Sequence, residues 1–148
     1  MAVKEVAYNL DGIAKLPINY FAVNGVVEII EYDLDKFLVM ERSYSAGYGS
    51  HGNTIKIFRV DVTKATNILN LEKLKGQDFI FAEKELLFNF KTERKKLTEH
   101  IIDNIEGMTL GPKLENGEQS LIVVSDNNFN SFVKQLNQFI LLKINFKN

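Results

Sequence analysis

Two stretches of the chain place acidic, basic or amide side chains beside apolar segments. The first contains Glu28 and Arg42, and the second contains Glu106, Asp126 and Asn127. Carboxylate and amide oxygens are the hard ligands that Ca²⁺ prefers, and the ion takes about six to eight of them. This chemistry predicts Ca²⁺ as a cofactor, with the following candidate metal ligands: Glu28, Glu106, Asp126 and Asn127.

The same residues could act on an ester. Phosphate esters are polyanions, so a site lined with carboxylates needs a bound cation or an arginine to accept them. Arg42 could supply that positive charge, while Glu106 and Asp126 could serve as bases or metal ligands. The candidate catalytic residues are therefore Glu106, Asp126 and Arg42, and the predicted substrate is a small-molecule ester or phosphoester.

Each of these residues also has a structural interpretation. Glu106 and Gly107 could form a tight turn that accepts backbone hydrogen bonds. The run from Asp126 to Asn128 is typical of turns whose side chains bond their own backbone. Arg42 could pair with Glu41, or with another acid, instead of binding phosphate. Both interpretations stay open from the sequence alone.

Other familiar catalytic sets find little support. The chain has no cysteine, which excludes disulfides, thiolate nucleophiles and cysteine-based metal sites. It has two histidines, His51 and His100, and no G-x-S-x-G elbow, so a Ser-His-Asp set or a histidine zinc site is weakly supported. Within the loop of residues 45–53, Gly47, Gly49 and Gly52 spell G-x-G-x-x-G, but a strand pattern follows from Thr54 where a dinucleotide site needs a helix. We interpret this segment as a hairpin loop.

Length and composition indicate one soluble globular domain. The chain has 148 residues, of which 45% are hydrophobic and 25% are charged, as in ordinary globular proteins. Its formal net charge of -1 argues against a nucleic-acid partner. We also expect no membrane span, because no apolar run reaches about 18 residues. Residues 1–6 lack the apolar centre of a signal peptide.

Short apolar or alternating runs between turn residues predict an all-β fold. We expect about eight strands, namely the stretch around Glu106 and residues 4–10, 26–32, 37–40, 54–62, 83–91, 121–124 and 136–146. The apolar face changes between Ile57 and Val60, which predicts a bulge near Phe58. Residues 93–100 are charged and free of glycine and proline, so they could form one or two helical turns.

The strands are arranged in a repeat. Glu28 and Glu106 each follow a short apolar run, and each precedes a turn, an apolar strand and a polar ending. Repeated units of three or four antiparallel strands are typical of β-propeller blades. We predict antiparallel four-stranded blades of a β-propeller, with about two blades present, at residues 25–92 and 101–146 of a single segment 1–148. A chance similarity of two meanders is the alternative.

Three sequence segments carry a family resemblance. FLVMERSY at residues 37–44, DNIEGMTLGP at 103–112 and SLIVVSDNNF at 120–129 resemble the phytase-like family, described as carrying an esterase-like activity of phytase. QFILLKI at residues 138–144 fits the closing strand of that family. The resemblance extends over residues 25–144.

The resemblance implies a β-propeller and a hydrolase of phosphoric or carboxylic esters. Family members are usually longer, so the chain resembles their C-terminal part. We therefore expect either a fragment whose remaining blades are missing from this chain or a chain that partners complete. The resemblance also implies export of the full-length protein to an extracytoplasmic or secreted location. Because propellers host enzymes and binders alike, a non-catalytic module that binds a ligand or protein is the competing function.

Overall fold

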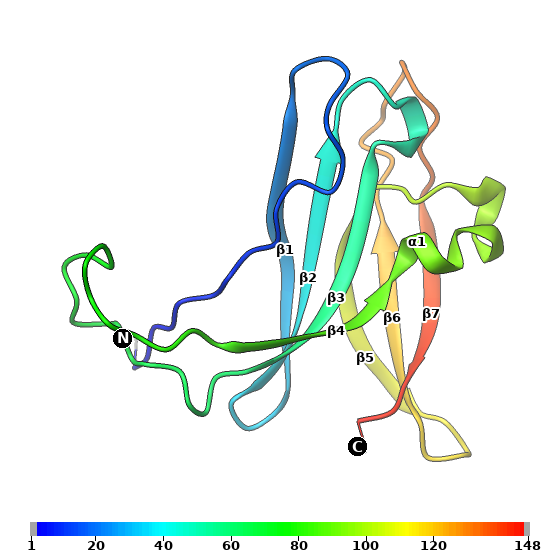
Figure 1. The fold of residues 1–148 in the computed structure, drawn as a ribbon. Coiled ribbons are helices and arrows are strands. Elements are labelled where there is room, and N and C mark those ends of the chain that lie inside the picture. The colour runs from blue at the N-terminus through cyan, green and yellow to red at the C-terminus, as the bar shows by residue number, and fades with distance from the viewer. Residues whose placement is uncertain (1–2, 147–148) are drawn as a thin grey trace.

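The computed structural model describes residues 3–146, which form two antiparallel β-sheets (Figure 1). The first sheet has the strand order β1-β2-β3-β4, with β1 Ala22–Asp33, β2 Lys36–Ser45, β3 Asn53–Asp61 and β4 Glu83–Asn89. The second has the order β5-β6-β7, with β5 Ile105–Lys113, β6 Gln119–Ser125 and β7 Gln138–Ile144. Each strand pairs with the next along the chain, so both sheets are meanders.

Helical structure is limited to single turns. A 3₁₀ turn, Gly49–His51, lies between β2 and β3. Helix α1, Phe90–Glu93, follows β4, and the 3₁₀ turns Arg94–Lys96 and Thr98–His100 continue toward β5. The helical turns expected at residues 93–100 are confirmed. No helix within residues 3–146 is long and apolar enough to cross a membrane.

The two sheets pack face to face around one hydrophobic core. Alternate residues of a strand point to the same face, and the fully buried ones come from both sheets: Leu38, Met40, Ile55, Ile57, Ile105, Leu121 and Val123. Phe90 of α1 is also fully buried in this core. Burial of one such side chain contributes about 1.5–3 kcal/mol, so this cluster holds the two sheets together.

The expected strands agree with the structure except at the N-terminus. Seven strands are present in residues 3–146, and residues 4–10, predicted as a strand, have no strand structure. That prediction was wrong because the segment joins no ladder. Its carbonyls at Glu5 and Ala7 accept single hydrogen bonds from Ile68 and Ala82.

The bulge expected near Phe58 is confirmed. Ile57 pairs with Phe88 and Phe58 pairs with Leu86, so Leu87 of β4 is the extra residue. β3 itself alternates regularly. Ile55 and Ile57 face the inter-sheet core, whereas Phe58, Val60 and Val62 belong to a second cluster. The apolar pattern therefore changes because the first part of β3 is buried on the face toward the second sheet, whereas its later part is buried on the opposite face.

The second cluster lies where the N-terminal segment crosses the outer face of the first sheet. Its buried members are Val39, Phe58, Val60, Val62 and Ala82, with Val6 and Tyr8 packed against them. In Figure 1 this segment runs from the first sheet toward the loop between β3 and β4. The loop and the N-terminal segment thus cover part of this face together.

A buried group of charges anchors the N-terminal segment. The side chain of Glu41, on β2, is 2% exposed, and its Oε1 lies 2.5 Å from Lys84 Nζ and accepts a 2.6 Å hydrogen bond from Tyr8 Oη. Asp11 bridges Lys84 and Lys56, at 2.6 and 2.7 Å. Its backbone N–H also donates to Glu41 Oε2. Burial, together with the adjacent Glu41 carboxylate, raises the pKa of Tyr8, so the phenol stays protonated.

We expect Lys84→Met to lower the free energy of unfolding by about 3–5 kcal/mol, because it leaves the buried Glu41 carboxylate without its cation. Urea unfolding monitored by circular dichroism measures this loss. The matched control is Lys64→Met, because Lys64 forms an exposed ion pair with Glu83. The control is expected to lose less than about 1 kcal/mol. Equal losses in the two variants would contradict the stabilising role of Lys84 beside the buried Glu41 carboxylate.

The pKa of Asp11 should also make stability depend on pH. Burial raises this pKa, but the hydrogen bonds and positive charges of Lys56 and Lys84 lower it by more, so it lies below its usual range. Such a carboxylate stabilises the fold above its unfolded pKa of about 3.9, and the contribution is lost as pH falls through the folded pKa. We expect Asp11→Asn to flatten the fall in unfolding free energy below about pH 4. Urea titrations, with the exposed-loop variant Asp78→Asn as control, test this.

Candidate functional site

A pocket of about 360 Å³ lies where chain segments from both sheets meet. It lies at the end of the molecule where the β2–β3 loop and the β6–β7 loop come together (Figure 1). Most of the residues that line it are polar, and those used below are Arg42, Tyr44, Asn53, Asn104, Glu106 and Gln135. We call it the inter-sheet pocket.

The pocket brings together two of the predicted catalytic residues. Arg42 Nη1, on β2, lies 3.0 Å from Glu106 Oε1, on β5. The same oxygen accepts a 2.8 Å hydrogen bond from Asn104 Nδ2. The alternative in which Arg42 pairs with another acid is confirmed, and that acid belongs to the second sheet. The ion pair therefore joins the polar ending of the first predicted repeat to the acid near the start of the second.

A β-bulge aims Glu106 at the pocket. Ile105 pairs with Ser125 and Gly107 with Val124, which leaves Glu106 as the extra residue. Bulges re-aim side chains in this way. β1 has the same irregularity at Val27, and Glu28 beyond it pairs directly with Met40. Glu28 thus corresponds to Gly107 in the repeat, and the expected equivalence of Glu28 and Glu106 is off by one residue.

Asp103 fixes the wall of the pocket. Its side chain is buried, with Oδ1 accepting from the Asn104 N–H and Oδ2 from the Leu136 N–H. Ser125 Oγ donates to the Leu136 carbonyl at 2.6 Å, and the Asp126 N–H donates to the Asn104 carbonyl at 3.1 Å. These bonds hold the β6–β7 loop against the start of β5.

Asp126 and Asn127 have the local role that their sequence allows. Asp126 Oδ1 accepts from the Asn128 N–H at 3.0 Å, and Asn127 Oδ1 accepts from the Phe129 N–H at 3.0 Å. Each side chain bonds the backbone two residues ahead, as in an Asx turn. The turn-forming interpretation is confirmed for both residues. Of this run, only Asn128 lines the inter-sheet pocket.

The predicted calcium ligands do not converge. No group of three or more His, Cys, Asp or Glu side chains in the described part of the chain is placed to hold a metal ion. Glu28 Oε1 accepts from the N–H of Ile29, while Glu106 Oε1 is engaged by Arg42 and Asn104. Ca²⁺ needs about six to eight oxygen ligands. Residues 3–146 hold no such cluster of carboxylates, and the calcium site stays a prediction.

Two pocket residues were not identified from the sequence. Asn53 begins β3 and is 6% exposed, and Gln135 lies in the β6–β7 loop. Within residues 3–146, neither Asn53 Oδ1 nor Gln135 Oε1 has a hydrogen-bond partner, although both atoms are buried. Buried acceptors without a donor are costly and uncommon. Asn53 follows the glycine-rich loop, but nothing in the sequence distinguishes Gln135.

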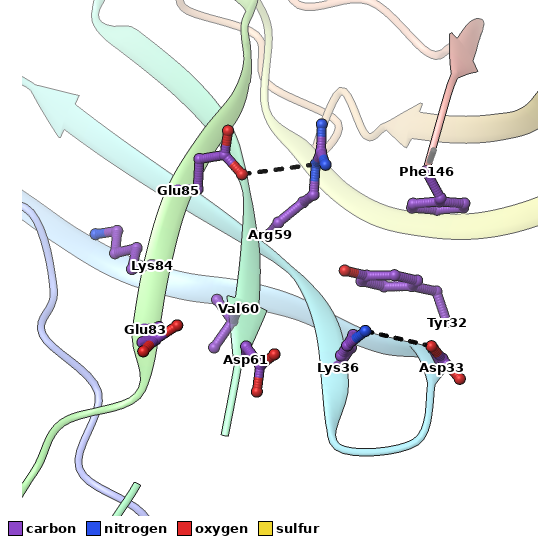
Figure 2. A pocket seen from close by; sticks show the side chains of 10 residues that line it. All are labelled: Tyr32, Asp33, Lys36, Arg59, Val60, Asp61, Glu83, Lys84, Glu85 and Phe146. Carbon is purple, nitrogen blue, oxygen red and sulfur yellow. Dashed lines mark ion pairs between the residues drawn. The ribbon is translucent and has the colours of Figure 1, made fainter. Parts of the chain in front are cut away.

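A larger cleft of about 490 Å³ lies at the opposite strand ends (Figure 2). Tyr32 of β1 stacks on Phe146, with ring centroids 4.3 Å apart. Burial, partly opposed by Lys36 and Arg59, raises the pKa of Tyr32. In this cleft Lys36 pairs with Asp33 at 3.5 Å, and Arg59 lies 4.0 Å from Glu85.

The larger cleft contains none of the predicted site residues. Lys84, which also lines it, points away from Arg59 in Figure 2 and binds Glu41 and Asp11 instead. The lysine and arginine side chains that line the larger cleft therefore already have acidic partners within the protein. The inter-sheet pocket combines an arginine–carboxylate pair with two unpaired acceptors, and we take it as the candidate functional site.

We expect a double-mutant cycle on Arg42→Gln and Glu106→Gln to give a coupling of about 0.5–1 kcal/mol in the free energy of unfolding. The magnitude is modest because both side chains are partly exposed, at 24% and 42%. The pair Lys96 and Glu93, which joins neighbouring helical turns, is the control for local ion pairing. Strictly additive effects at Arg42 and Glu106 would contradict a stabilising link between the sheets.

Comparison with known proteins gives one result. No curated protein and no solved structure matches the chain. The family model Phytase-like, described as esterase-like activity of phytase, matches residues 1–129. This match includes the N-terminal segment that covers the first sheet, both strands that carry Arg42 and Glu106, and most of the pocket. The chain belongs to the phytase-like family.

Proposed function

We propose that the two sheets are neighbouring blades of a β-propeller, with blade units at residues 25–92 and 101–146. Three observations support this. Both sheets are meanders, they pack face to face, and β1 and β5, the first strand of each, contact each other as innermost strands do. Each of these first strands also carries a bulge, at Val27 in β1 and at Glu106 in β5. Further blades from the full-length protein or a partner would close the ring.

We propose that the inter-sheet pocket is part of a site that hydrolyses a phosphoric or carboxylic ester. The observation that carries the proposal is the ion pair of Arg42 and Glu106 at a pocket shared by both sheets. A guanidinium has five N–H donors, so Arg42 can bind an anionic ester oxygen while Nη1 remains on Glu106. Glu106, positioned by Asn104, is then placed to accept a proton from an attacking water.

The proposed hydrolysis does not depend on Ca²⁺ bound by residues 3–146. No group of three or more His, Cys, Asp or Glu side chains within residues 3–146 is placed to hold a metal ion, so no step proposed here passes through Ca²⁺. Any Ca²⁺ bound by the full-length protein would take most of its ligands from other blades. Membership of the family supports export of the full-length protein, which is the location we propose.

A non-catalytic binding module is the second candidate. The specific observation in its favour is the pair of buried acceptors, Asn53 Oδ1 and Gln135 Oε1, which need a donor but supply no reacting group. Both candidates place the ligand in the same pocket. They differ in whether Glu106 carries out chemistry or only orients Arg42.

We expect the full-length protein to hydrolyse phytate or an aryl ester above the background rate, and Arg42→Gln to raise KM by about 10- to 100-fold. The reason is the loss of a charge-assisted hydrogen bond of about 1.5–3 kcal/mol. Initial rates with and without Ca²⁺ provide the measurement, with Lys36→Gln in the opposite cleft as the control. Background rates on both substrates would favour the binding module.

We expect Glu106→Gln to abolish turnover and leave the Ca²⁺ affinity of the full-length protein unchanged, because Glu106 is engaged by Arg42 and Asn104. Isothermal titration of both proteins with Ca²⁺ measures this. A Glu106→Gln variant that loses Ca²⁺ binding would restore Glu106 as a metal ligand.

A further inference from the structure

The outer face of the second sheet is apolar and exposed. Alternate residues of a strand share a face, and Ile122, Val124, Phe139 and Leu141 alternate with the residues of β6 and β7 that lie in the inter-sheet core. Phe139 is 80% exposed and Leu141 is 61% exposed. They pair directly with Val124 and Ile122, so the four side chains form one continuous surface, which we call the outer patch. Exposed apolar patches on folded proteins mark interaction sites.

The repeat of the two sheets indicates what this patch packs against. Because both first strands are bulged, Glu28 of β1 is equivalent to Gly107 of β5. Glu28 pairs with Met40, and Gly107 pairs with Val124. Met40 of the first sheet is therefore equivalent to Val124 of the outer patch.

The same equivalence extends along the neighbouring strands. Leu38 corresponds to Ile122, and Ile57, which pairs with Met40, corresponds to Phe139. Leu38, Met40 and Ile57 are fully buried between the two sheets. The outer patch is thus the face that the first sheet buries against a neighbouring sheet, but in the second sheet it has no such neighbour within residues 3–146.

The outer face of the first sheet is the matching surface. Val39 on this face corresponds to Val123 of the second sheet, and Phe58 corresponds to Ile140. Val123 and Ile140 both lie in the inter-sheet core. The two outer faces are therefore equivalent to the two inner faces, which already pack against each other.

The outer face of the first sheet also has an unfilled groove. The N-terminal segment covers this face only in part and leaves an apolar groove of about 260 Å³, whose lining includes Val26, Ile29 and Val39. Ile29 is 53% exposed. An apolar cavity of about 150 Å³ is enough to hold benzene, so the groove has room for an aromatic side chain such as that of Phe139.

Charges at the edges of the two faces are opposite in sign. Glu31 lies two residues beyond Ile29 on β1, and Lys143, which lies 3.8 Å from Glu118, is two residues beyond Leu141 on β7. The β1–β2 and β5–β6 turns lie at the same end of the molecule (Figure 1), so both charges are near that end. A contact between the two outer faces that repeats the inner one brings these charges to the same end.

We propose that the outer patch of one chain packs against the apolar groove of a second copy of this chain, in a head-to-tail contact that repeats the inter-sheet core. This rests on the proposed blade arrangement and names the occupant of the open faces. A contact between two different surfaces is heterologous, and it continues until a ring closes. Propellers have about four to eight blades, so about two to four chains of two blades would complete one.

Sedimentation velocity of the 148-residue chain tests the proposal. We expect an average mass above the 16.9 kDa of one chain, rising with protein concentration. Phe139→Ser and Ile29→Ser should each raise the dissociation constant at least tenfold, because each removes an apolar anchor from one of the two surfaces. The matched control is Phe132→Ser, at a position in the β6–β7 loop that is 95% exposed, and it should associate like the unchanged chain.

A mixture of the two variants tests the head-to-tail geometry. The Phe139→Ser chain keeps an intact groove, and the Ile29→Ser chain keeps an intact outer patch. Each variant alone should remain monomeric, whereas the equimolar mixture should form a dimer through the one contact that both chains can still complete.

The outcomes are distinguishable. A chain that is monomeric at every concentration overturns the proposal. Association that is lost in Phe139→Ser but kept in Ile29→Ser overturns it as well, because two outer patches would then pair with each other. If Phe139→Ser lacks the thermal unfolding transition of a folded protein, Leu141→Ser decides by the same criterion. Head-to-tail association without ester hydrolysis would support this inference and reject the hydrolase, and hydrolysis by a monomer would do the reverse.

Discussion

The buried carboxylate of Glu41 is the constraint on which the rest of the structure depends. A charge at this depth is tolerated only with a cation and hydrogen bonds around it. Lys84 supplies the cation from β4, and Tyr8, Asn24 and the Asp11 N–H supply hydrogen bonds. The N-terminal segment therefore lies on the first sheet without joining it as a strand. The same contact fixes β4 relative to β2 across β3.

Neighbouring residues of β2 make contacts on opposite faces of the sheet. Successive side chains of a strand point to opposite sides. Glu41 and Ser43 face outward, where Ser43 Oγ accepts from the Ala14 N–H. Arg42 faces inward and reaches Glu106 of the second sheet. The Glu-Arg-Ser sequence therefore fastens the N-terminal segment on one side and positions the candidate site on the other.

Alternation of apolar and polar residues predicted most of the fold. The strands from Ala22 onward and the hairpin at residues 45–53 follow from local sequence patterns, whereas the bulge opposite Phe58 has its extra residue, Leu87, in β4. Residues 4–10 alternate in the same way, but what decides their conformation is a lysine more than 70 residues away. Pattern alone cannot identify such a partner. The one-residue offset between Glu28 and Glu106 likewise depends on bulges that only strand pairing reveals.

The candidate site was predictable only in part. Arg42 and Glu106 are recognisable in the sequence as charges beside apolar strands. Asn53 and Gln135 become pocket residues only because two loops pack together, which the sequence does not show. The central claim is that this inter-sheet pocket is where the ligand binds. An NMR titration of the ¹⁵N-labelled chain with inorganic phosphate tests it most directly. The account predicts shifts of the Arg42 Nε–H and of the side-chain amides of Asn53 and Gln135. Shifts confined to the cleft around Tyr32 and Arg59 would contradict it.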